Sequence, residues 1–509
     1  LYFNENNFDE ALKNFNKSLE INPSYTDAYL NKGHLYRKSK EYIKAIQNYE
    51  KVLSISPKYE FAQSILLHTK MIICDWHKFY ENLELYTNEI LIGNKQSYPF
   101  SSLSIIDDPK TQKLIIENYV AKYQPFKKEL GNLKKYNNKK IRIGYFSTDF
   151  GEHPVSYLIA ELFELHDRKK FEIIGFYYGS NQDNNMFKRI KSSFDEFINI
   201  THQSDKESAK LSRNKNIDIA IDLTGHTNGG RVGIFSYRAA PLQLSYIGFL
   251  GTMGSNYYDY LIADKVIIPE KNQKFYTEKI AYLPNYQIND SKREISKKTF
   301  SRKNLNLPID SFVFCCFNNN YKITPSIFKV WMQILNAVPD SVLFLYSDNK
   351  WAKQNLKKEA NSFNIESNRV IFASRVIREE YLARYKVADL FLDTYPYNAG
   401  TTASDALWAG LPVLTYSGNN FAGRVCSSIL KSIGLDELIA NSLEDYQNLA
   451  VHLATHPEKM QKLKSQLKKN IKNKPLFDSK LFTNNIEKLY EVVLKRYNIG
   501  LKPENIEVS

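Results

Sequence analysis

The sequence predicts a helical repeat segment followed by an α/β region of two lobes, and three observations support this prediction. Residue types recur at an offset of 34 near the N-terminus, short apolar runs then alternate with helix-like stretches, and a polar segment divides those runs into two blocks. The chain has 509 residues, of which 43% are apolar and 24% charged, as is typical of a globular protein with several cores. It does not begin with Met, and we expect it to be a piece of a longer protein.

The repeat occupies residues 1–60. Small residues let paired helices approach each other, aromatic rings fill the groove between them, and proline ends the second helix. Gly33, three residues before Tyr36, is the small residue. A period of 34 is typical of tetratricopeptide repeats, and we expect further repeats before Leu1 because so few do not make a stable solenoid. The recurring pairs are Tyr2 and Tyr36, Ala11 and Ala45, Phe15 and Tyr49, Ser18 and Val52, and Pro23 and Pro57.

Residues 61–138 keep a helical pattern but lose the repeat, which predicts an adaptor with helices over 74–85 and 111–123. The stretch rich in Lys and Asn at 134–140 marks the boundary with the next region.

Residues 139–300 and 301–509 are predicted as two Rossmann-like lobes, joined by a polar linker at 285–306. Short apolar strands separated by helices are typical of parallel sheets covered on both faces, and ligands bind beyond the carboxyl ends of such strands. A final helix at 482–497 is expected to pack back on the lobes. The predicted strands are 141–147, 172–178, 217–223, 242–248, 260–262 and 280–283 in the first lobe, and 312–317, 342–347, 370–373, 390–393 and 413–416 in the second.

Composition excludes several classes of protein. No apolar run of about 18 residues is present, so no membrane span is expected. The net charge of +14 suits an anionic ligand, but the lysines at 134–140 and 468–474 form no recognisable nucleic-acid motif and predict solvated surface, not nucleic-acid binding. The cysteines lack C-x-x-C spacing, which predicts buried free thiols in a reducing cytoplasm and no metal site. They are Cys74, Cys315, Cys316 and Cys426.

Polar clusters follow several predicted strands, where a ligand would bind. His153 lies in a loop bounded by Gly151 and Pro154 and is a candidate general base. Lys322 stands just before a helix that Pro325 begins, where a cation can neutralise a phosphate. Glycine-containing loops also follow the strands that end near Asp222 and Gly248, and such loops can present backbone N–H groups to an anion.

The segment 393–405 runs from a strand into a helix. Thr402 is predicted as its N-cap, with Asp405 in the capping-box position, and the exposed helix N-terminus would hold a phosphate. The two lobes contain no D-x-D sequence, so Lys322 and this helix are expected to act on a diphosphate without a metal ion.

Six motifs in this order resemble those of the O-GlcNAc transferase family, in particular its bacterial Spindly-like branch. The resemblance covers about residues 60–497 and implies a GT-B fold, a nucleotide-sugar donor, inversion at the anomeric carbon, and Ser or Thr hydroxyls of proteins as acceptors. The repeats would take part in binding these proteins. The motifs are 147–153, 222–227, 248–254, 317–325, 393–410 and 421–425.

The resemblance also implies roles for single residues. Lys322 matches the lysine on the donor diphosphate, and His153 the proposed base or an orienter of the acceptor. The loops with Asp222, His226, Gly251 and Thr252 match the acceptor side of the cleft. The remaining donor-binding matches are Asn319, Arg378, Tyr381, Arg384, Gly400, Thr401, Thr402 and Asp405.

Two positions depart from the family pattern, which often has His where this chain has Gly400 and Pro where it has Leu250. Either a histidine donor is missing at Gly400, or the loop needs a positive φ that only glycine tolerates. The expected donor is UDP-GlcNAc with no cofactor. A GDP-fucose-dependent O-fucosyltransferase and a catalytically weak scaffold that binds proteins through its repeats are the alternatives.

Overall fold

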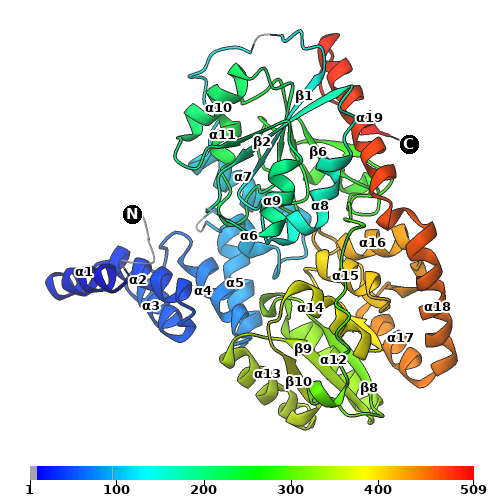
Figure 1. Cartoon of the computed structure of the whole chain (residues 1–509). Coiled ribbons are helices and arrows are strands. Elements are labelled where there is room, and N and C mark those ends of the chain that lie inside the picture. The colour runs from blue at the N-terminus through cyan, green and yellow to red at the C-terminus, as the bar shows by residue number, and fades with distance from the viewer. Residues whose placement is uncertain (1–7, 94–95, 134, 181, 509) are drawn as a thin grey trace.

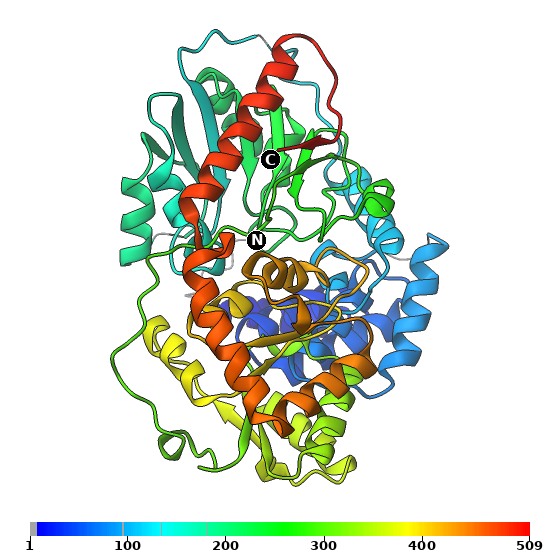
Figure 2. The ribbon, with the colours of Figure 1, turned by 90° about the vertical axis from the view of Figure 1, so that its right-hand side faces the viewer.

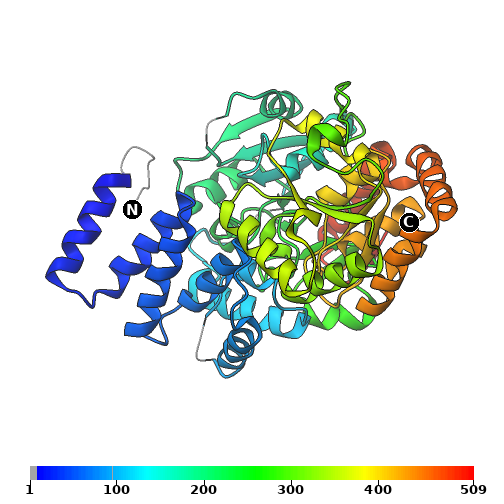
Figure 3. The same cartoon turned by 90° about the horizontal axis from the view of Figure 1, so that it is seen from below.

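The computed structural model describes residues 8–93, 96–133, 135–180 and 182–508. A helical N-terminal segment projects from a body of two α/β lobes (Figure 1). Figure 3 shows the first helices extending to one side of that body. The predicted fold class is confirmed, while Tyr2 of the repeat and Lys134 of the predicted boundary lie outside the described residues.

Three helices form the repeat segment: α1 (Phe8–Ile21), α2 (Thr26–Lys38) and α3 (Tyr42–Ile55). A Cβ atom on Gly33 would lie 2.4 Å from Cε1 of Tyr49, so glycine is needed where α2 and α3 approach each other. The Tyr49 ring is fully buried in this contact. The predicted roles of the small residue and the aromatic ring are therefore confirmed.

Four helices form the adaptor, and the first of its two predicted helices begins later than expected. Cys74 and Lys78 have φ values of 52° and 53°, a left-handed conformation that interrupts a right-handed helix, so the helix begins at Phe79. The four helices are α4 (Ala62–Ile72), α5 (Phe79–Leu91), α6 (Pro99–Ser102) and α7 (Pro109–Tyr123).

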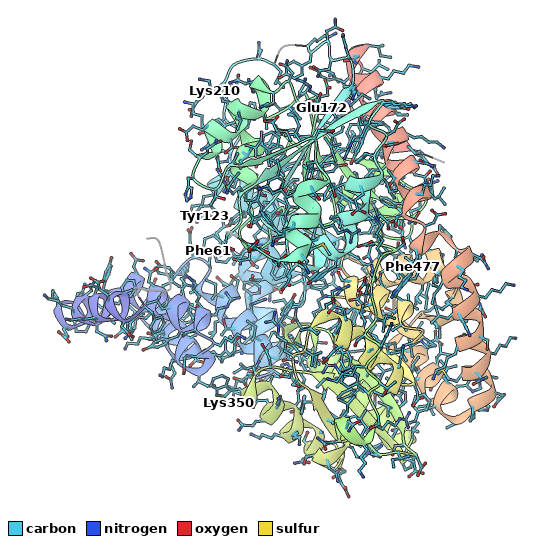
Figure 4. All side chains as sticks on the ribbon, in the orientation of Figure 1. Phe61, Tyr123, Glu172, Lys210, Lys350 and Phe477 are labelled. Carbon is cyan, nitrogen blue, oxygen red and sulfur yellow. The ribbon has the colours of Figure 1, made fainter. Side chains whose placement is uncertain are left out.

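Contacts around Glu60 and Phe61 join the end of the repeat segment to the adaptor. The ring of Phe61 stacks on Tyr98, with centroids 4.2 Å apart, and its centroid lies 5.2 Å from that of Tyr123. Figure 4 labels Phe61 and Tyr123 side by side. The carboxylate of Glu60 accepts hydrogen bonds from Lys122 and Tyr123 on α7. The repeat helices are thus held against the body at a defined place.

The first lobe contains eight parallel strands in the order β14-β7-β6-β5-β4-β1-β2-β3. Ile143 at its centre lies opposite Ile173 on one side and Ile219 on the other, and all three are fully buried. Burial on both faces explains why these strands are continuous apolar runs. The strands are β1 (Ile141–Ser147), β2 (Phe171–Tyr177), β3 (Glu196–Asn199), β4 (Ile219–Asp222), β5 (Leu242–Ser245), β6 (Tyr260–Ala263), β7 (Lys279–Tyr282) and β14 (Ile506–Glu507).

The second lobe contains six parallel strands in the order β10-β9-β8-β11-β12-β13. Its strands are β8 (Phe312–Cys316), β9 (Ser341–Tyr346), β10 (Val370–Ala373), β11 (Leu390–Leu392), β12 (Val413–Tyr416) and β13 (Ile439–Ala440). The helices of the two lobes are α8 (Pro154–Leu165), α9 (Asn185–Ser192), α10 (Asp205–Asn214), α11 (Val232–Ser236), α12 (Pro325–Ala337), α13 (Lys350–Ser362), α14 (Arg378–Arg384), α15 (Thr401–Trp408), α16 (Val425–Ile433), α17 (Leu443–Thr455), α18 (Pro457–Asn473) and α19 (Ser479–Asn498).

The polar segment at 285–306 begins as part of the contact between the lobes and not as a solvated linker. Asn285, Gln287 and Asn289 are at most 3% exposed. Gln287 Nε2 donates to Ser404 Oγ on α15 at 2.6 Å, and Asn289 Nδ2 donates to the carbonyl of Leu476 at 3.1 Å. These amides are polar because they bind partners inside the protein.

The C-terminal segment returns to the first lobe, as the red helix in Figure 2 shows. Glu487 on α19 accepts a hydrogen bond from His166 Nδ1 at 2.9 Å, and Tyr490 contacts Tyr145 of β1. The chain then adds β14 beside β7. The expected final helix is confirmed, and it packs on the first lobe against α8 and β5.

Candidate active site

Lys322 lies in the turn that follows β8, at the carboxyl end of the second sheet. Its Nζ donates to the carbonyl oxygen of Asn398 at 2.9 Å and lies 3.7 Å from the centre of the Tyr397 ring. Burial lowers the pKa of Lys322 to about 8, although the Asp393 carboxylate acts in the opposite direction. An ammonium group has three N–H donors, and the Asn398 carbonyl takes one of them.

Asp393 shapes the loop that leads from β11 to α15. Its Oδ1 accepts hydrogen bonds from the backbone N–H groups of Thr394 and Ala399, both at 2.7 Å, and its Oδ2 accepts from Thr415 Oγ1 at 2.7 Å. Burial raises the pKa of Asp393 to about 6. The loop is therefore closed on itself, and it places the Asn398 carbonyl where it meets Lys322.

Helix α15 begins at Thr401 with Gly400 as its N-cap, which corrects the prediction that Thr402 caps it. Thr402 Oγ1 donates to Asn318 Oδ1, and Asp405 does not complete a capping box. Among the described residues no side chain caps this helix, so its first N–H groups lack that partner. Gly400 has φ of −106°, which contradicts the alternative that the loop needs a positive φ.

Asp405 is 1% exposed and is held by two arginines. Arg378 donates to both of its oxygens, at 3.1 and 2.8 Å, and Arg293 donates to Oδ1 at 3.1 Å. Asp405 is therefore the centre of an ion-pair network that joins α14, α15 and the interlobe segment. The contact with the donor that the family resemblance implies for Asp405 would have to share these oxygens.

The same arginine reaches across to the first lobe. The guanidinium of Arg378 lies 3.9 Å from the centre of the Tyr157 ring on α8, a cation–π contact. The backbone N–H of Tyr157 donates to the carbonyl of His153 at 3.1 Å, one helical turn earlier. His153 therefore lies one helical turn from Tyr157, the residue that contacts Arg378 of the second lobe.

His153 is the N-cap of α8. Its Nδ1 accepts a hydrogen bond from the backbone N–H of Val155 at 3.3 Å, so the proton of the neutral ring is assigned to Nε2. Although 44% of the side chain is exposed, desolvation by its neighbours lowers the pKa of His153 to about 4. In this arrangement the imidazole is neutral and offers a donor, not an acceptor.

Asp149 faces that donor and was not among the candidates singled out from the sequence. Its Oδ1 lies 3.7 Å from His153 Nε2, and its Oδ2 accepts from Thr224 Oγ1 at 3.4 Å. Burial raises the pKa of Asp149 to about 7, and the nearby Asp222 carboxylate adds to the rise. A carboxylate with this pKa is well matched to proton transfer near neutral pH.

Three predicted donor residues of the second lobe differ in accessibility. Asn319 is exposed at the turn before Lys322. Tyr381 shares a hydrogen bond of 2.5 Å with Tyr385 and is partly buried. Arg384 is 2% exposed and donates to the backbone carbonyl of Ser374 at 2.6 Å, so it lies inside the lobe instead of facing the cleft.

Among the predicted acceptor-side residues, Asp222 organises a loop and His226 lines a pocket. Asp222 Oδ1 accepts hydrogen bonds from the backbone N–H groups of Thr224 and Gly225 at 3.0 and 2.8 Å. His226 Nε2 donates to the carbonyl of Met253 at 3.0 Å, and burial lowers its pKa to about 4.

Gly251 and Thr252 are buried inside the protein. The loop that contains them packs under α7, and a Cβ on the nearby Gly254 would meet Ile116 Cγ2 at 2.6 Å. Thr252 Oγ1 donates to the buried Glu278 at 2.8 Å. Glycine serves close packing here, not the approach of an anion.

The profile of the family described as "Glycosyl transferase family 41" matches residues 109–299 and 289–486, which is more than half of the chain. The chain belongs to glycosyl transferase family 41. Tetratricopeptide-repeat profiles match residues 1–39 and 26–59. The predicted family and its repeats are thereby confirmed.

Curated relatives in family 41 align with most of the chain. A probable UDP-N-acetylglucosamine–peptide N-acetylglucosaminyltransferase SEC of Arabidopsis thaliana is 33% identical over 87% of this chain and 48% of its own length. The corresponding transferase of Caenorhabditis elegans is 25% identical over 73% of this chain and 42% of its own length. The chain thus spans about half the length of these relatives.

A solved structure superposes on nearly the entire length of this family 41 chain. A mutant of Thermobaculum terrenum O-GlcNAc transferase superposes with a TM-score of 0.78 and 22% identity, covering 98% of this chain and 100% of that one. This likeness confirms the GT-B arrangement of two lobes behind helical repeats. In the part of the chain that the structure describes, none of the helices has the length and apolar character of a membrane span.

Proposed function

We propose that the chain transfers N-acetylglucosamine from UDP-GlcNAc to serine and threonine hydroxyls of proteins, with inversion and without a metal ion. The main support for this proposal is the position of Lys322. Its ammonium group stands beside the N-terminus of α15, where no side chain caps the helix, and both features attract a diphosphate. The names of the curated relatives support UDP-GlcNAc as donor and peptides as acceptors.

In the proposed step, the acceptor oxygen forms a bond to C1 of the sugar on the face opposite the diphosphate. The bond between C1 and the phosphate oxygen breaks, and its electron pair leaves with UDP. Lys322 and the first N–H groups of α15 stabilise the growing charge, which is electrostatic catalysis by donors already in place. No divalent ion is required for this role.

The hydroxyl proton goes to Asp149 in this proposal. Its raised pKa, about 7, makes the carboxylate a better proton acceptor than the His153 ring, whose free position is a donor. His153 Nε2–H would orient the acceptor hydroxyl, and Thr224 would hold the carboxylate. This assigns His153 the second of the two roles that the family resemblance implies.

Arg378, Thr401 and Thr402 are proposed to contact the donor. Arg378 lies in a network with Asp405 and Tyr157, so its side chain is fixed where the two lobes meet. Thr401 is the first residue of α15, so its backbone N–H belongs to the uncapped N-terminus of that helix. We place Tyr381 and Asn319 at the edge of this site, with no cofactor besides the donor.

The repeats are proposed to bind protein acceptors, and the cytoplasm is the proposed compartment. All four cysteines are buried and free, as expected for a reducing environment. No nucleic-acid partner is proposed.

The test is label transfer to a peptide array that displays serine and threonine in varied contexts. We expect label from UDP-GlcNAc on hydroxyl peptides, released by a β-specific hexosaminidase because inversion of the α-linked donor gives a β linkage. Label from GDP-fucose alone would favour the fucosyltransferase alternative. The absence of transfer and hydrolysis with either donor would favour the scaffold.

A further inference from the structure

An open pocket of about 340 Å³ lies where the repeat, the adaptor and the first lobe meet. The repeat contributes His34 and Arg37 from α2, and the first lobe contributes the loop at 225–230. The adaptor contributes Ile65, residues 98–101, Tyr119 and Gln124. No single domain of the chain could form this pocket alone.

Arg37 is the charged residue of this pocket. None of the residues lining the pocket is acidic. The one hydrogen bond that the Arg37 side chain makes within the described ranges goes to Nδ1 of His68 at 2.9 Å. A guanidinium carries five N–H donors in a planar fork, so most of its capacity for a carboxylate stays unused.

The histidines around Arg37 are neutral, so the pocket carries a net charge of one, that of the Arg37 guanidinium. Burial, with the nearby Arg37 charge, lowers the pKa of His34 to about 4 and that of His68 to about 3. His226 on the opposite wall is likewise neutral, with a pKa of about 4. An anionic group entering the pocket therefore meets one positive charge and no competing carboxylate among the lining residues.

The pocket shares a loop with the candidate active site. Thr224 contacts Asp149, and the loop that follows it continues through His226 to Gly229. A Cβ on Gly229 would lie 3.2 Å from the Thr148 side chain, one residue before Asp149. A polypeptide with its hydroxyl at Asp149 could thus extend along this loop toward Arg37.

We propose that this pocket binds an acidic side chain of the acceptor polypeptide, with its carboxylate paired to Arg37. The pocket then selects hydroxyls that have Asp or Glu at a fixed distance along the chain. This inference rests on the proposed function and extends it to acceptor choice. Through Arg37, the repeat segment would then take part directly in selecting the acceptor sequence near the hydroxyl.

The experiment measures the binding of fluorescent peptides in the presence of UDP. Each peptide carries one threonine and one Glu, moved in steps of one residue, and each has a matched Gln peptide. At one spacing we expect the wild-type chain to bind Glu about 10-fold more tightly than Gln, the range for one charge-assisted pair. Arg37→Gln should remove this preference, and Arg37→Lys should keep part of it.

Two controls make the result specific. Lys51→Glu changes an exposed charge on α3, outside the pocket, and should keep the preference for Glu. Arg37→Glu should favour a Lys peptide over the Glu peptide. Thermal unfolding of every variant verifies that the repeat stays folded.

Equal binding of Glu and Gln peptides at every spacing, or a preference that survives in folded Arg37→Gln, would overturn the proposal. Donor hydrolysis by the wild-type chain without peptide tests the proposed function separately. If the chain selects acidic peptides but hydrolyses no nucleotide sugar, the proposal for the pocket stands and the proposed transferase activity is contradicted.

Discussion

The guanidinium of Arg378 on α14 of the second lobe lies over the ring of Tyr157 on α8 of the first lobe, 3.9 Å from its centre. Arg378 also holds Asp405 on the donor side, and Tyr157 follows His153 by one helical turn on the acceptor side. The distance between the two halves of the candidate site therefore depends on this contact.

Replacing Tyr157 with leucine should lower the transfer rate by about 3- to 10-fold, because a partly buried cation–π contact contributes on the order of 1 kcal/mol. Affinity for UDP should change less than the rate, because the donor groups lie in the second lobe. Tyr157→Phe keeps the ring and is the control. A larger loss of UDP affinity than of rate would place the contact in donor binding instead.

Lys322→Ala should reduce donor hydrolysis and transfer by roughly 100-fold, the effect of one lost donor to a charged transition state of about 3 kcal/mol. Lys329→Ala removes an exposed lysine from α12 and should leave the rate unchanged. Turnover near the wild-type level in a folded Lys322→Ala protein would remove Lys322 from the mechanism.

Transfer should persist in excess EDTA, because Lys322 and the N-terminus of α15 supply the positive charge that a divalent ion supplies elsewhere. The measurement is the initial rate after chelation, with and without added magnesium or manganese. Activity lost on chelation and restored by either ion would contradict this charge arrangement.

The pH profile of kcat/KM should be bell-shaped. Asp149 must be ionised to accept a proton, so the rate should rise with pH through about 7. Lys322 must be protonated to bind the diphosphate, so the rate should fall above about 8. Asp149→Asn should lose most activity at every pH, whereas a flat wild-type profile from pH 6 to 9 would exclude both assignments.

Gly400→His should tighten UDP binding by about 1 kcal/mol, the scale of one added hydrogen bond. The backbone permits it, because φ is −106°, but a Cβ would approach Gln287 Oε1 to 3.3 Å. Gly400→Ala adds only the Cβ and measures the cost of that contact. Calorimetric titration with UDP compares all three proteins; weaker binding by the histidine variant than by Gly400→Ala would show that the ring is not accommodated.

Much of the fold could be predicted because buried parallel strands are apolar runs and repeats keep fixed offsets. The strands that sequence missed carry no such signal. β3 (Glu196–Asn199) is a short, half-exposed edge strand, while β13 and β14 have two residues each. Their position is set by neighbours far along the chain and not by their own pattern.

The candidate site was predictable in part. Lys322 and His153 follow strands, where ligands bind in such sheets. In the structure Lys322 lies in the turn after β8, and His153 lies between β1 and α8. Asp149 gains its raised pKa from burial and from Asp222, which no local pattern reveals. Arg384 matches a donor-binding arginine of the family, but tertiary packing buries its side chain, which donates to the carbonyl of Ser374.

The most direct test of the central claim is calorimetric titration of the chain with UDP, UDP-GlcNAc and GDP-fucose, repeated with Lys322→Ala. We predict that the wild-type chain binds UDP and UDP-GlcNAc more tightly than GDP-fucose, and that the variant loses at least about 10-fold in affinity for both uridine ligands. Tighter binding of GDP-fucose, or equal binding of UDP by the two proteins, would contradict a site built on Lys322 for a uridine-diphosphate sugar.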